Sequence, residues 1–507
     1  MTRVVSAVRR EPITFAALGG LVVVAAVARF ATLDGQSFDG DEMLTVSHLN
    51  MSFGGMLSTV AQPERTPPLY FVVAWVWIRL FGAGEVGLRS LSALAGTALV
   101  PVAFLAAREL VSRRGALISA ALVAVSPWLV WYSQEARAYA LAALLVGLSF
   151  MFFAGLLRAP TKRGFCWWAV TSSLAIATHY FASFAVLPEA IWVLRSRRTS
   201  RRAAVVSVAA VATVMVALIP LALHQRAVTP TDVVIANGGS LGFRIADVAK
   251  QSLVGFDAPS EIALGIGAAA LCAVAVALLL TRADARERRG AGVAAIISAS
   301  VLVLAVGFAV AGLDYVVSRN MIVAWVPAAI VVGAGFGAMR GHGIGIAAAT
   351  ALAALFAAIV VAVAVDPRYQ RTDWRGAAAA LGRPIVNRAL VIQPWLPQYR
   401  TYLPGIRRVP PRGGRVAEVD LVAIAGAVSA PGRVRHAPTA GAIRPPAMGF
   451  HEIERRHGDT FTVVRFRSPT PILLTRSALA ASGLKRHRAA AVLYQRSPGP
   501  PLPAAQG

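Results

Sequence analysis

Long apolar runs separated by short polar segments continue along the chain to about residue 365. Several of these runs exceed the ~20 residues that an α-helix needs to cross a bilayer. The composition agrees, with 57% hydrophobic residues and a mean hydropathy of +0.63. We therefore predict an all-α polytopic membrane protein. About eleven spans are expected, over residues 13–33, 86–107, 115–131, 138–157, 165–179, 181–194, 203–223, 260–280, 291–312, 320–339 and 343–365.

The apolar segment 67–81 decides the predicted topology. Its 15 residues would reach only about 22 Å at 1.5 Å per residue, which is short for a span. If it crossed the membrane, the arginines of residues 108–114, 195–202 and 282–289 would all lie outside. Because Arg and Lys gather in short cytoplasmic loops, this segment is predicted to lie in the outer interface or to re-enter. The outer loop 34–85 and the C-terminal region are then extracytoplasmic, and the N-terminus is cytoplasmic.

The N-terminal segment allows a second interpretation. Three arginines among the first ten residues, an apolar run and then Ala26-Val-Ala28 resemble a secretory signal peptide. The run is long for such a peptide and further spans follow, so we expect an uncleaved first span in the inner (plasma) membrane. Within the outer loop, residues 53–60 are mildly amphipathic and are predicted to lie on the membrane surface.

The composition changes at Asp366, where Pro, Arg and short β-prone runs replace the apolar spans. A helix is predicted over Trp374 to Leu381. The β-prone runs that follow it are 389–392, 419–424, 461–466 and 490–494. This alternation predicts a small extracytoplasmic α/β domain. The expected domains are residues 1–365, 366–495 and a disordered tail, 496–507. An outer loop with a turn at Asn237-Gly-Gly239 is expected over 224–258.

The net charge of +26 comes from 50 Lys and Arg against 24 Asp and Glu. In a soluble protein this balance would indicate nucleic acid. Here the basic residues fall in loops between spans and in the tail, so orientation and anionic lipid headgroups explain them better. No nucleic-acid partner is expected. Cys166 and Cys272 both lie in apolar runs, which indicates buried thiols and no disulfide framework.

An acidic cluster follows the first span, in a chain with few acids. Asp39, Asp41 and Glu42 stand within four residues of one another. Carboxylates so close repel each other, so that one pKa rises or a cation lies nearby. The cluster is therefore the first candidate for chemistry. The alternative is a helix start, with a capping side chain and acids that favour the helix dipole.

The predicted topology brings further polar residues to the same side of the membrane. They are Glu64, Arg65, Gln134, Glu135, Arg137, His179, Asp314 and Arg319. Charges at a membrane boundary are common, so the functional interpretation depends on convergence from separate segments. Simpler alternatives are an Arg319–Asp314 ion pair, pairing of Glu135 with Arg137, and a boundary position for His179.

Five short motifs carry a specific resemblance. They are Arg65-Thr-Pro-Pro-Leu-Tyr70, Leu88-Arg-Ser-Leu-Ser-Ala-Leu-Ala-Gly96, Tyr132-Ser-Gln-Glu-Ala-Arg-Ala-Tyr139, Thr178-His-Tyr180, and Arg319-Asn with Pro327. Over about residues 10–375 the chain resembles the GT-C membrane glycosyltransferases, in the family 39-like branch that includes lipid A aminoarabinose transferases and protein O-mannosyltransferases. Thr66 departs from this pattern, because a histidine is expected before the paired prolines.

The resemblance implies transfer of a hexosyl or pentosyl group, mannose among the candidates, with inversion. The donor would be a polyprenyl-phosphate sugar, and the acceptor an envelope glycan, lipid or protein. By resemblance, Asp41 is the general base and Glu42 orients it or binds sugar hydroxyls. Arg319 is the best phosphate ligand. The other donor-binding candidates are Arg65, Gln134, Glu135, Arg137 and His179.

No cofactor is required by this interpretation. A divalent cation, Mg²⁺ or Mn²⁺, has possible ligands in Asp41, Glu42, Glu135 and His179, but no spacing motif demands one. Since a monophosphate donor carries less charge than a diphosphate, we predict metal independence. Two other functions stay open. A transporter or flippase of a lipid-linked sugar would need paired repeats and charges deep inside spans. An envelope polymerase or ligase would use a diphosphate donor.

Overall fold

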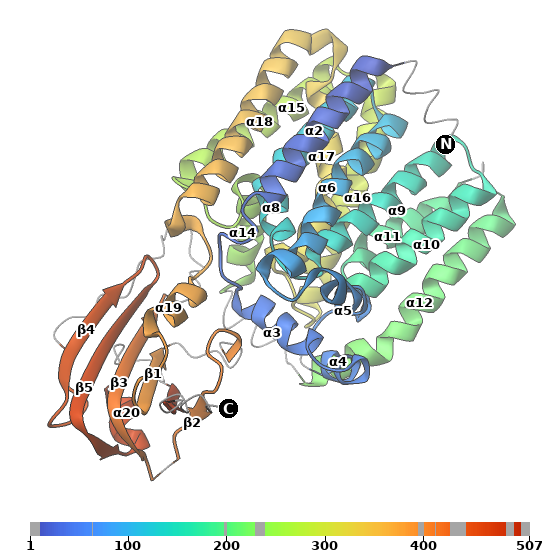
Figure 1. Cartoon of the computed structure of the whole chain (residues 1–507). Coiled ribbons are helices and arrows are strands. Elements are labelled where there is room, and N and C mark those ends of the chain that lie inside the picture. The colour runs from blue at the N-terminus through green and yellow to red at the C-terminus, as the bar shows by residue number, and fades with distance from the viewer. Residues whose placement is uncertain are drawn as a thin grey trace, which may run out of the picture. The chain divides into compact units, whose positions relative to one another are not determined.

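The computed structural model describes residues 11–62, 64–196, 200–228, 239–393, 400–410, 412–425, 443–482 and 491–497. The chain divides into two compact units (Figure 1). The helical unit comprises Met1–Leu33 and His48–Ala364, and the sheet unit comprises Asp34–Ser47 and Val365–Gly507. The C-terminal boundary lies next to the predicted one, at residue 365. The segment Asp34–Ser47, which we assigned to the membrane domain, instead groups with the C-terminal residues.

Each predicted span coincides with a helix or a pair of helices. The helices are α2 (Pro12–Phe30), α3 (Gly40–Leu49), α4 (Phe53–Val60), α5 (Leu69–Phe81), α6 (Glu85–Leu110), α7 (Arg113–Val125), α8 (Pro127–Ser133), α9 (Tyr139–Arg158), α10 (Lys162–Thr178), α11 (Ala182–Arg195), α12 (Arg201–Val228), α14 (Leu241–Val254), α15 (Glu261–Arg282), α16 (Ala285–Val310), α17 (Trp325–Phe336) and α18 (His342–Val365). Short 3-10 turns are η1 (Ser318–Ala324), η2 (Met339–Gly341) and η3 (Pro367–Tyr369).

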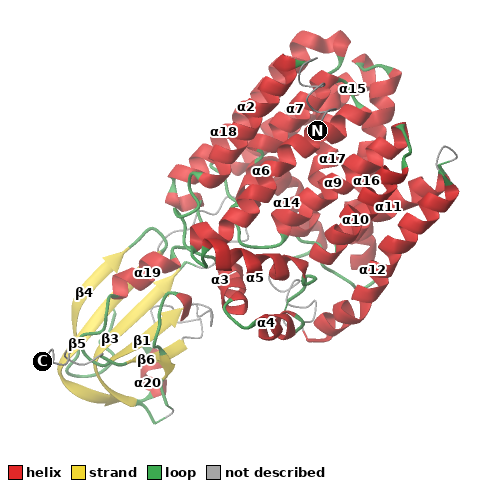
Figure 2. Cartoon of the chain, turned by 45° about the vertical axis from the view of Figure 1, so that its right-hand side comes forward, coloured by secondary structure: helices red, strands yellow, loops and turns green. Residues whose placement is uncertain are grey.

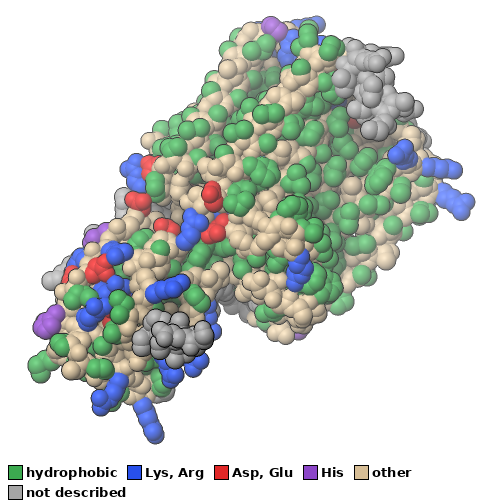
Figure 3. All heavy atoms as spheres, viewed as in Figure 1, with side chains coloured by type: hydrophobic (Ala, Val, Ile, Leu, Met, Phe, Trp, Pro, Cys, Tyr) green, Lys and Arg blue, Asp and Glu red, His purple; other side chains and the backbone are tan. Residues whose placement is uncertain are grey.

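The prediction of a helical multi-span unit is confirmed. Among the described residues, eight helices are long and apolar enough to cross a membrane, or nine if the bent pair α7–α8 counts as one span. This is fewer than the eleven spans expected, because α10 and α11 have only 17 and 14 residues. Hydrophobic side chains cover most of the visible flank of this unit (Figure 3), as a lipid-facing surface requires.

The α7–α8 break has a clear physical cause. Pro127 cannot donate a backbone hydrogen bond, and the two helix axes differ by 52°. The fully buried Arg29 of α2 fills the break, because its Nη1 donates to the Ala124 carbonyl at 2.7 Å and its Nη2 to that of Val123 at 3.0 Å. In return Gln134, after α8, donates to the Ala28 carbonyl at the end of α2. Each helix end is thus capped by a side chain of the other segment.

Successive spans alternate in direction, so their connections gather at two ends of the helical unit (Figure 2). One end holds 134–138, 179–181 and 311–317, together with α4 and α5. The opposite end holds basic residues with acidic partners, such as Arg108, whose Nη1 donates to Glu11 at 2.7 Å. The residues of the resemblance and the arginine-rich connections therefore occupy opposite ends, as the predicted topology requires.

The residues between α12 and α15 correct one prediction. We expected a loop over 224–258, but α12 continues to Val228 and α14 occupies Leu241–Val254. α14 is amphipathic, and Ser240 caps its first turn by accepting a hydrogen bond from the Phe243 amide. The predicted turn at Asn237 lies outside the described residues.

The sheet unit contains six strands in the order β2-β6-β1-β3-β5-β4. They are β1 (Arg388–Gln393), β2 (Arg407–Arg408), β3 (Gly414–Ile424), β4 (His451–His457), β5 (Phe461–Leu474) and β6 (Ala491–Gln495). β1 and β3 pair in parallel, and the other pairs are antiparallel. Helices α19 (Trp374–Leu381) and α20 (Arg476–Ala481) complete the unit. All four predicted strands and the predicted helix are present.

Hydrogen bonds explain why the segment 34–47 belongs to the sheet unit. Ser37 Oγ donates to the Thr372 carbonyl and accepts from the Trp374 amide, both at 2.9 Å. The Phe38 amide donates to the Tyr402 hydroxyl at 2.6 Å. Of the tail that we predicted to be disordered, 496–507, the first two residues are described, and Ser497 forms hydrogen bonds with Asn387 and Ile385. The rest of the tail, 498–507, lies outside the described residues.

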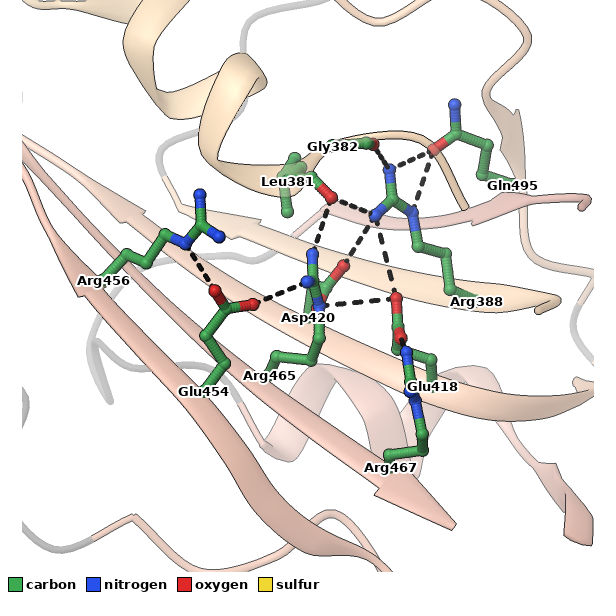
Figure 4. A network of polar contacts seen from close by, with 10 residues as sticks. All are labelled: Leu381, Gly382, Arg388, Glu418, Asp420, Glu454, Arg456, Arg465, Arg467 and Gln495. Carbon is green, nitrogen blue, oxygen red and sulfur yellow. Dashed lines mark hydrogen bonds and ion pairs between the residues drawn. The ribbon is translucent and has the colours of Figure 1, made fainter. Parts of the chain in front are cut away.

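One face of the sheet carries an ionic network under α19 (Figure 4). Asp420 of β3 accepts from Arg388 Nη1 at 3.1 Å and from Arg465 Nε at 2.8 Å. Both arginines also donate to the Leu381 carbonyl at 2.6 Å, at the C-terminus of α19. Glu418 accepts from Arg467 at 2.6 Å. Two cations thus stabilise the negative end of the helix dipole while a buried carboxylate balances them.

Candidate functional site

The acidic cluster forms the start of α3, in the sheet unit. The Asp39 amide donates to Glu42 Oε2 at 2.9 Å, and Asp39 Oδ1 accepts from the Gly40 amide at 2.7 Å. Glu42 is fully buried, 4.0 Å from Arg371 Nε. The bond from the Asp39 amide to Glu42 is one half of a capping box, so the helix-start alternative accounts for these contacts of Asp39 and Glu42. Asp41 lies half-buried in the same first turn, directly before Glu42.

A buried ion pair in the helical unit joins the Tyr132–Tyr139 motif to Glu64, the residue directly before the Arg65–Tyr70 motif. Arg137 donates from Nη1 and Nη2 to the two carboxylate oxygens of Glu64, at 3.0 and 2.8 Å. The Arg137 guanidinium also lies over the Phe71 ring, 5.9 Å from its centroid. We had considered Glu135 as the partner of Arg137. Glu64 was among the polar residues predicted on the same side of the membrane, but nothing in the sequence pairs it with Arg137.

His48, at the end of α3, completes this cluster. Its Nδ1 lies 3.6 Å from Glu64 Oε1, and its ring is 6.0 Å from that of Phe71. Burial lowers the pKa of His48; the Glu64 carboxylate opposes this shift and the Arg137 charge adds to it. The imidazole is therefore neutral near pH 7, and the carboxylate of Glu64 faces one full positive charge, that of Arg137.

One polar side chain, that of Gln225, holds the loop that carries Arg65. Gln225 of α12 donates to the carbonyls of Val60 and Thr66 at 3.1 and 3.2 Å, and it accepts from the Tyr180 hydroxyl at 3.0 Å. The loop before α5 and the Thr178-His-Tyr180 motif therefore share one anchor. Sequence reasoning missed Gln225, because a glutamine near the end of an apolar helix looks like an ordinary boundary residue.

Gln134 has contacts that explain its burial. Its Nε2 donates to Thr32 Oγ1 at 2.9 Å, besides the carbonyl at the end of α2. The neighbouring Glu135 is also buried, and its backbone carbonyl accepts from the Arg137 amide at 2.8 Å, which closes a tight turn. The run from Tyr132 to Tyr139 is thus a rigid connection between α8 and α9.

Asp314 and Arg319 precede α17. We had considered an ion pair between them, but Asp314 forms a two-bond pair with Arg244 of α14. Arg244 also donates to the Val316 carbonyl at 3.0 Å, so α14 fixes the segment leading into η1. The hydrogen bond from Arg244 lowers the pKa of Asp314. Arg319 stands at the start of η1, directly after this fixed segment.

His179 lies between α10 and α11, among aromatic rings. Its ring centroid is 5.9 Å from that of Tyr139 and 5.8 Å from that of Phe181, and Tyr139 contacts Tyr132 edge-on at 5.1 Å. The charges of Arg319 and Arg137 both act on the imidazole. Three motifs of the resemblance therefore meet at this ring, from three separate parts of the sequence.

Metal ligation was left open by the sequence. Within the described ranges there is no group of three or more His, Cys, Asp or Glu side chains that could hold a metal ion. Metal independence remains a prediction, because the reaction itself has to be assayed in the presence and absence of cations.

Comparison with known proteins gives one family match and several structural ones. Residues 65–224 match the sequence model of the family described as dolichyl-phosphate-mannose-protein mannosyltransferase. No curated protein matches the sequence. The structure of ArnT from Cupriavidus metallidurans bound to undecaprenyl phosphate superimposes with a TM-score of 0.51 at 14% identity, covering 88% of this chain and 97% of that one.

Two further structures are similar at lower scores. Oligosaccharyltransferase AglB from Archaeoglobus fulgidus, in complex with an inhibitory peptide and a dolichol-phosphate, has a TM-score of 0.42 at 13% identity, covering 73% of this chain and 58% of its own. Arabinofuranosyltransferase AftD from Mycobacteria has a TM-score of 0.42 at 14% identity, covering 90% and 41%.

The fold and the sequence match agree with the expected resemblance. The chain is a multi-pass membrane protein with a small C-terminal sheet unit, its fold is similar to that of ArnT, and its residues 65–224 resemble the dolichyl-phosphate-mannose-protein mannosyltransferase family. Its donor, its acceptor and its catalytic residues are the subject of the proposal that follows.

Proposed function

We propose that this protein is an inverting glycosyltransferase that moves a sugar from a polyprenyl-phosphate sugar to a glycan, lipid or protein acceptor. The observation that carries the proposal is the gathering of Glu64, Arg137, His179 and the segment before Arg319 at one end of a GT-C fold. A lipid phosphate as leaving group fits this end, because its charge needs guanidinium donors more than it needs a proton. Support also comes from ArnT, a protein of the same fold that binds undecaprenyl phosphate.

The proposed chemistry is a single displacement. Asp41 takes the proton of the acceptor hydroxyl as its oxygen attacks the anomeric carbon. The bond from that carbon to the phosphate oxygen breaks, and the polyprenyl phosphate leaves with the bonding electrons. Arg319 and Arg65 stabilise the charge that develops on the phosphate. Attack from the face opposite the leaving group inverts the anomeric configuration.

The remaining candidates have supporting roles in this proposal. Glu42 holds the first turn of α3 and so orients Asp41. Arg137 is a positioning residue, since its two terminal nitrogens are engaged by Glu64. Gln134 and Glu135 shape the sugar site from the rigid turn after α8. We propose that none of these groups requires a metal ion.

The proposed location is the inner membrane, with the N-terminus in the cytoplasm and the sheet unit outside. Support comes from the arginine-rich helix ends, which lie opposite the end that holds His179. A sugar carried on a polyprenyl phosphate would then be used on the extracytoplasmic face, where envelope acceptors are found.

Transport of the lipid-linked sugar is the alternative. Arg29 and Glu189 do lie inside predicted spans, and α7–α8 is a broken helix, as transporters often have. However, Arg29 is engaged by the carbonyls at the break, and Glu189 accepts hydrogen bonds from Ser149 at 2.6 Å and Trp168 at 2.9 Å. Both side chains are therefore engaged in hydrogen bonds between packed helices and do not mark a transport path. The transferase remains the better supported function.

The test is a transfer assay with the purified full-length protein in detergent. Wild-type protein should release free polyprenyl phosphate from a labelled polyprenyl-phosphate mannose or arabinose when an acceptor extract is present. Asp41→Asn should abolish release while the protein still purifies as a folded monodisperse species and binds the lipid. Unchanged release by Asp41→Asn would remove Asp41 from the mechanism, and movement of intact donor across vesicles without release would favour the transporter.

A further inference from the structure

We propose that the β2 edge of the sheet unit binds an acidic polysaccharide of the cell envelope. The binding surface consists of five exposed arginines, which we call the arginine edge: Arg407, Arg408, Arg412, Arg415 and Arg476. None of them is a candidate for the transfer chemistry. The proposal therefore depends on the proposed extracytoplasmic location of the sheet unit, but not on the proposed reaction.

The sheet unit carries a large excess of positive charge. Residues 34–47 and 365–507 contain 22 Lys and Arg against 11 Asp and Glu. Several of the acids already have partners, since Asp420 pairs with the arginines under α19, and Glu452 and Glu454 pair with arginines of β4. The residues of this unit that lie outside the described ranges include no Asp or Glu. The excess charge is therefore left for anions from outside the chain.

The two edge strands of the sheet, β2 and β4, differ in how their arginines are neutralised (Figure 1). Each strand carries an Arg-Arg pair, Arg407-Arg408 on β2 and Arg455-Arg456 on β4. On β4 both arginines donate to a glutamate of the same strand. On β2 both are exposed, and among the described residues neither forms an ion pair with an acidic side chain. Charge on an edge strand discourages edge-to-edge pairing, but this does not explain why β2 alone lacks the counter-charge.

The turn that leads from β2 into β3 adds two arginines. The Gly413 amide closes this turn by donating to the carbonyl three residues earlier, at 2.9 Å. Arg412 lies within the turn and Arg415 lies at the start of β3, and both are exposed. A Cβ at Gly414 would lie 3.8 Å from the Tyr494 ring of β6. The first residues of β3 therefore pass close to β6, which is the neighbour of β2 in the sheet.

Strand pairing brings the remaining arginines to the same end of the sheet. Tyr494 is opposite Arg407 in the β2–β6 pair. Leu473 is opposite Arg415 in the β3–β5 pair, and Arg476 begins α20 three residues after it. The register thus gathers the arginine edge at one end of the sheet, although its members come from β2, from the start of β3 and from α20.

The arginine edge presents charge on both faces of the sheet. Tyr494 packs against the apolar core that includes Leu479 of α20, so Arg407, which is directly opposite Tyr494, lies on the α20 face. Successive side chains of a strand point to opposite faces, which places Arg408 on the α19 face. Arg415 lies on that face too, because the next residue of β3 belongs to the core under α20. A flat bilayer contacts one face at a time, whereas a flexible polymer can pass around the edge and contact both.

Carboxylate and phosphate groups are the ligands that guanidinium groups bind best, through two parallel hydrogen bonds. A single exposed ion pair contributes little, so a ligand needs many anionic groups to bind here with useful affinity. An acidic polysaccharide has this property, and its chain is flexible. A second copy of this protein is disfavoured as the occupant, because it would bring the same positive charge to the surface.

The experiment measures binding of fluorescently labelled polygalacturonate to the full-length protein in nonionic detergent, by fluorescence anisotropy. Uncharged dextran should not bind, and added salt should weaken polygalacturonate binding. The double variant Arg407→Gln/Arg408→Gln removes two exposed ion-pair partners and should weaken binding by about tenfold. The matched control is Arg455→Gln/Arg456→Gln, which removes the same two charges from the other edge strand and should bind as the wild type does.

Each outcome bears on the assignment. Weaker binding by the β2 variant, with wild-type affinity in the β4 variant, supports it. Equal losses in the two variants would overturn it, because net charge rather than the arginine edge would then attract the polymer. Failure of the wild-type protein to bind polygalacturonate would also overturn it.

A second ligand separates a polysaccharide from a lipid surface. Lipid nanodiscs containing phosphatidylglycerol carry the anionic headgroups of a membrane without a polysaccharide. If the β2 variant lost affinity for these nanodiscs and kept its affinity for polygalacturonate, the surface would belong to lipid headgroups and the proposal would be wrong. Release of polyprenyl phosphate is measured separately, so that a negative binding result leaves the proposed function standing.

Discussion

Arg137 and Glu64, 73 residues apart, form a two-bond ion pair whose side chains are only 10% and 2% exposed. The pair joins the connection after α8 to the loop before α5. Since Arg65 follows Glu64 directly, its backbone position depends on a residue of the Tyr132–Tyr139 run. One contact therefore positions two parts of the proposed donor site.

Removing one member of this pair should strongly lower the stability of the folded protein. Arg137→Leu leaves the Glu64 carboxylate buried without its partner, and we expect a loss of about 3–5 kcal/mol of stability. The matched control is Arg158→Leu, which breaks the exposed pair with Glu109 and should cost at most about 1 kcal/mol. Thermal denaturation in detergent compares the two. Equal melting temperatures for both variants would show that the buried pair contributes no more than a surface pair.

Gly96 of α6 should not tolerate even a methyl group. A Cβ at this position would overlap Ser133 Oγ and lie 2.9 Å from Arg29 Nε, so the α7–α8 break could not be filled as it is. We expect Gly96→Ala to lower stability by about 1–3 kcal/mol, despite the better helix propensity of alanine. Gly155→Ala on α9 is the control, because nothing lies within 4 Å of its Cβ position. That variant should be unchanged or slightly more stable. Ser133→Gly should rescue part of the Gly96→Ala defect, and no rescue would place the clash elsewhere.

The pKa of His48 predicts a pH dependence near the proposed site. Burial lowers this pKa below 6.5 in the folded protein, so the unfolded chain binds more protons once the pH falls below 6.5. The contribution of His48 is fully present above pH 6.5 and is lost as the pH falls toward the lowered folded value. Melting temperatures between pH 7.5 and 5.5 should fall more steeply for the wild type than for His48→Gln. Parallel profiles would contradict the lowered pKa.

Helices and strands could be predicted from the sequence where a local pattern of residues determines them. The helices over Phe53–Val60 and Trp374–Leu381 have the predicted bounds, because apolar spacing lies within each segment and a capping residue, Ser52 or Asp373, directly precedes it. Strand β4 was missed, because His451-Glu-Ile-Glu-Arg-Arg-His457 is an exposed edge strand without an apolar face. Its charges discourage pairing with other chains. They also leave the strand without the alternation of apolar and polar residues by which strands are predicted from sequence.

The contacts between the candidate site residues could not be predicted from local sequence patterns. The candidate residues were found by residue type and by their side of the membrane, but their partners were not. Arg244 was not considered as the partner of Asp314, nor was Gln225 as an anchor for the loop before α5. Such pairs join helices far apart in sequence, and any acid or amide at a helix end would look equally suitable before the packing is known.

The network under α19 allows a test that is confined to the sheet unit. Asp420→Asn removes the charge that balances Arg388 and Arg465, and Arg388 is fully buried. Glu418, 3.8 Å from Arg388, compensates only in part, since it also pairs with Arg467. We expect about 3–5 kcal/mol of local destabilisation.

Hydrogen exchange of the full-length protein measures this effect where it occurs. Amides of β1 and α19 should exchange faster in Asp420→Asn, while those of α9 in the helical unit keep their wild-type rates. The control is Glu452→Gln on β4, which breaks an exposed pair with Arg455 and should change exchange little. Unchanged protection of β1 and α19 in Asp420→Asn would mean that the helix-end carbonyls alone hold Arg388, and that the carboxylate serves something other than the stability of this unit.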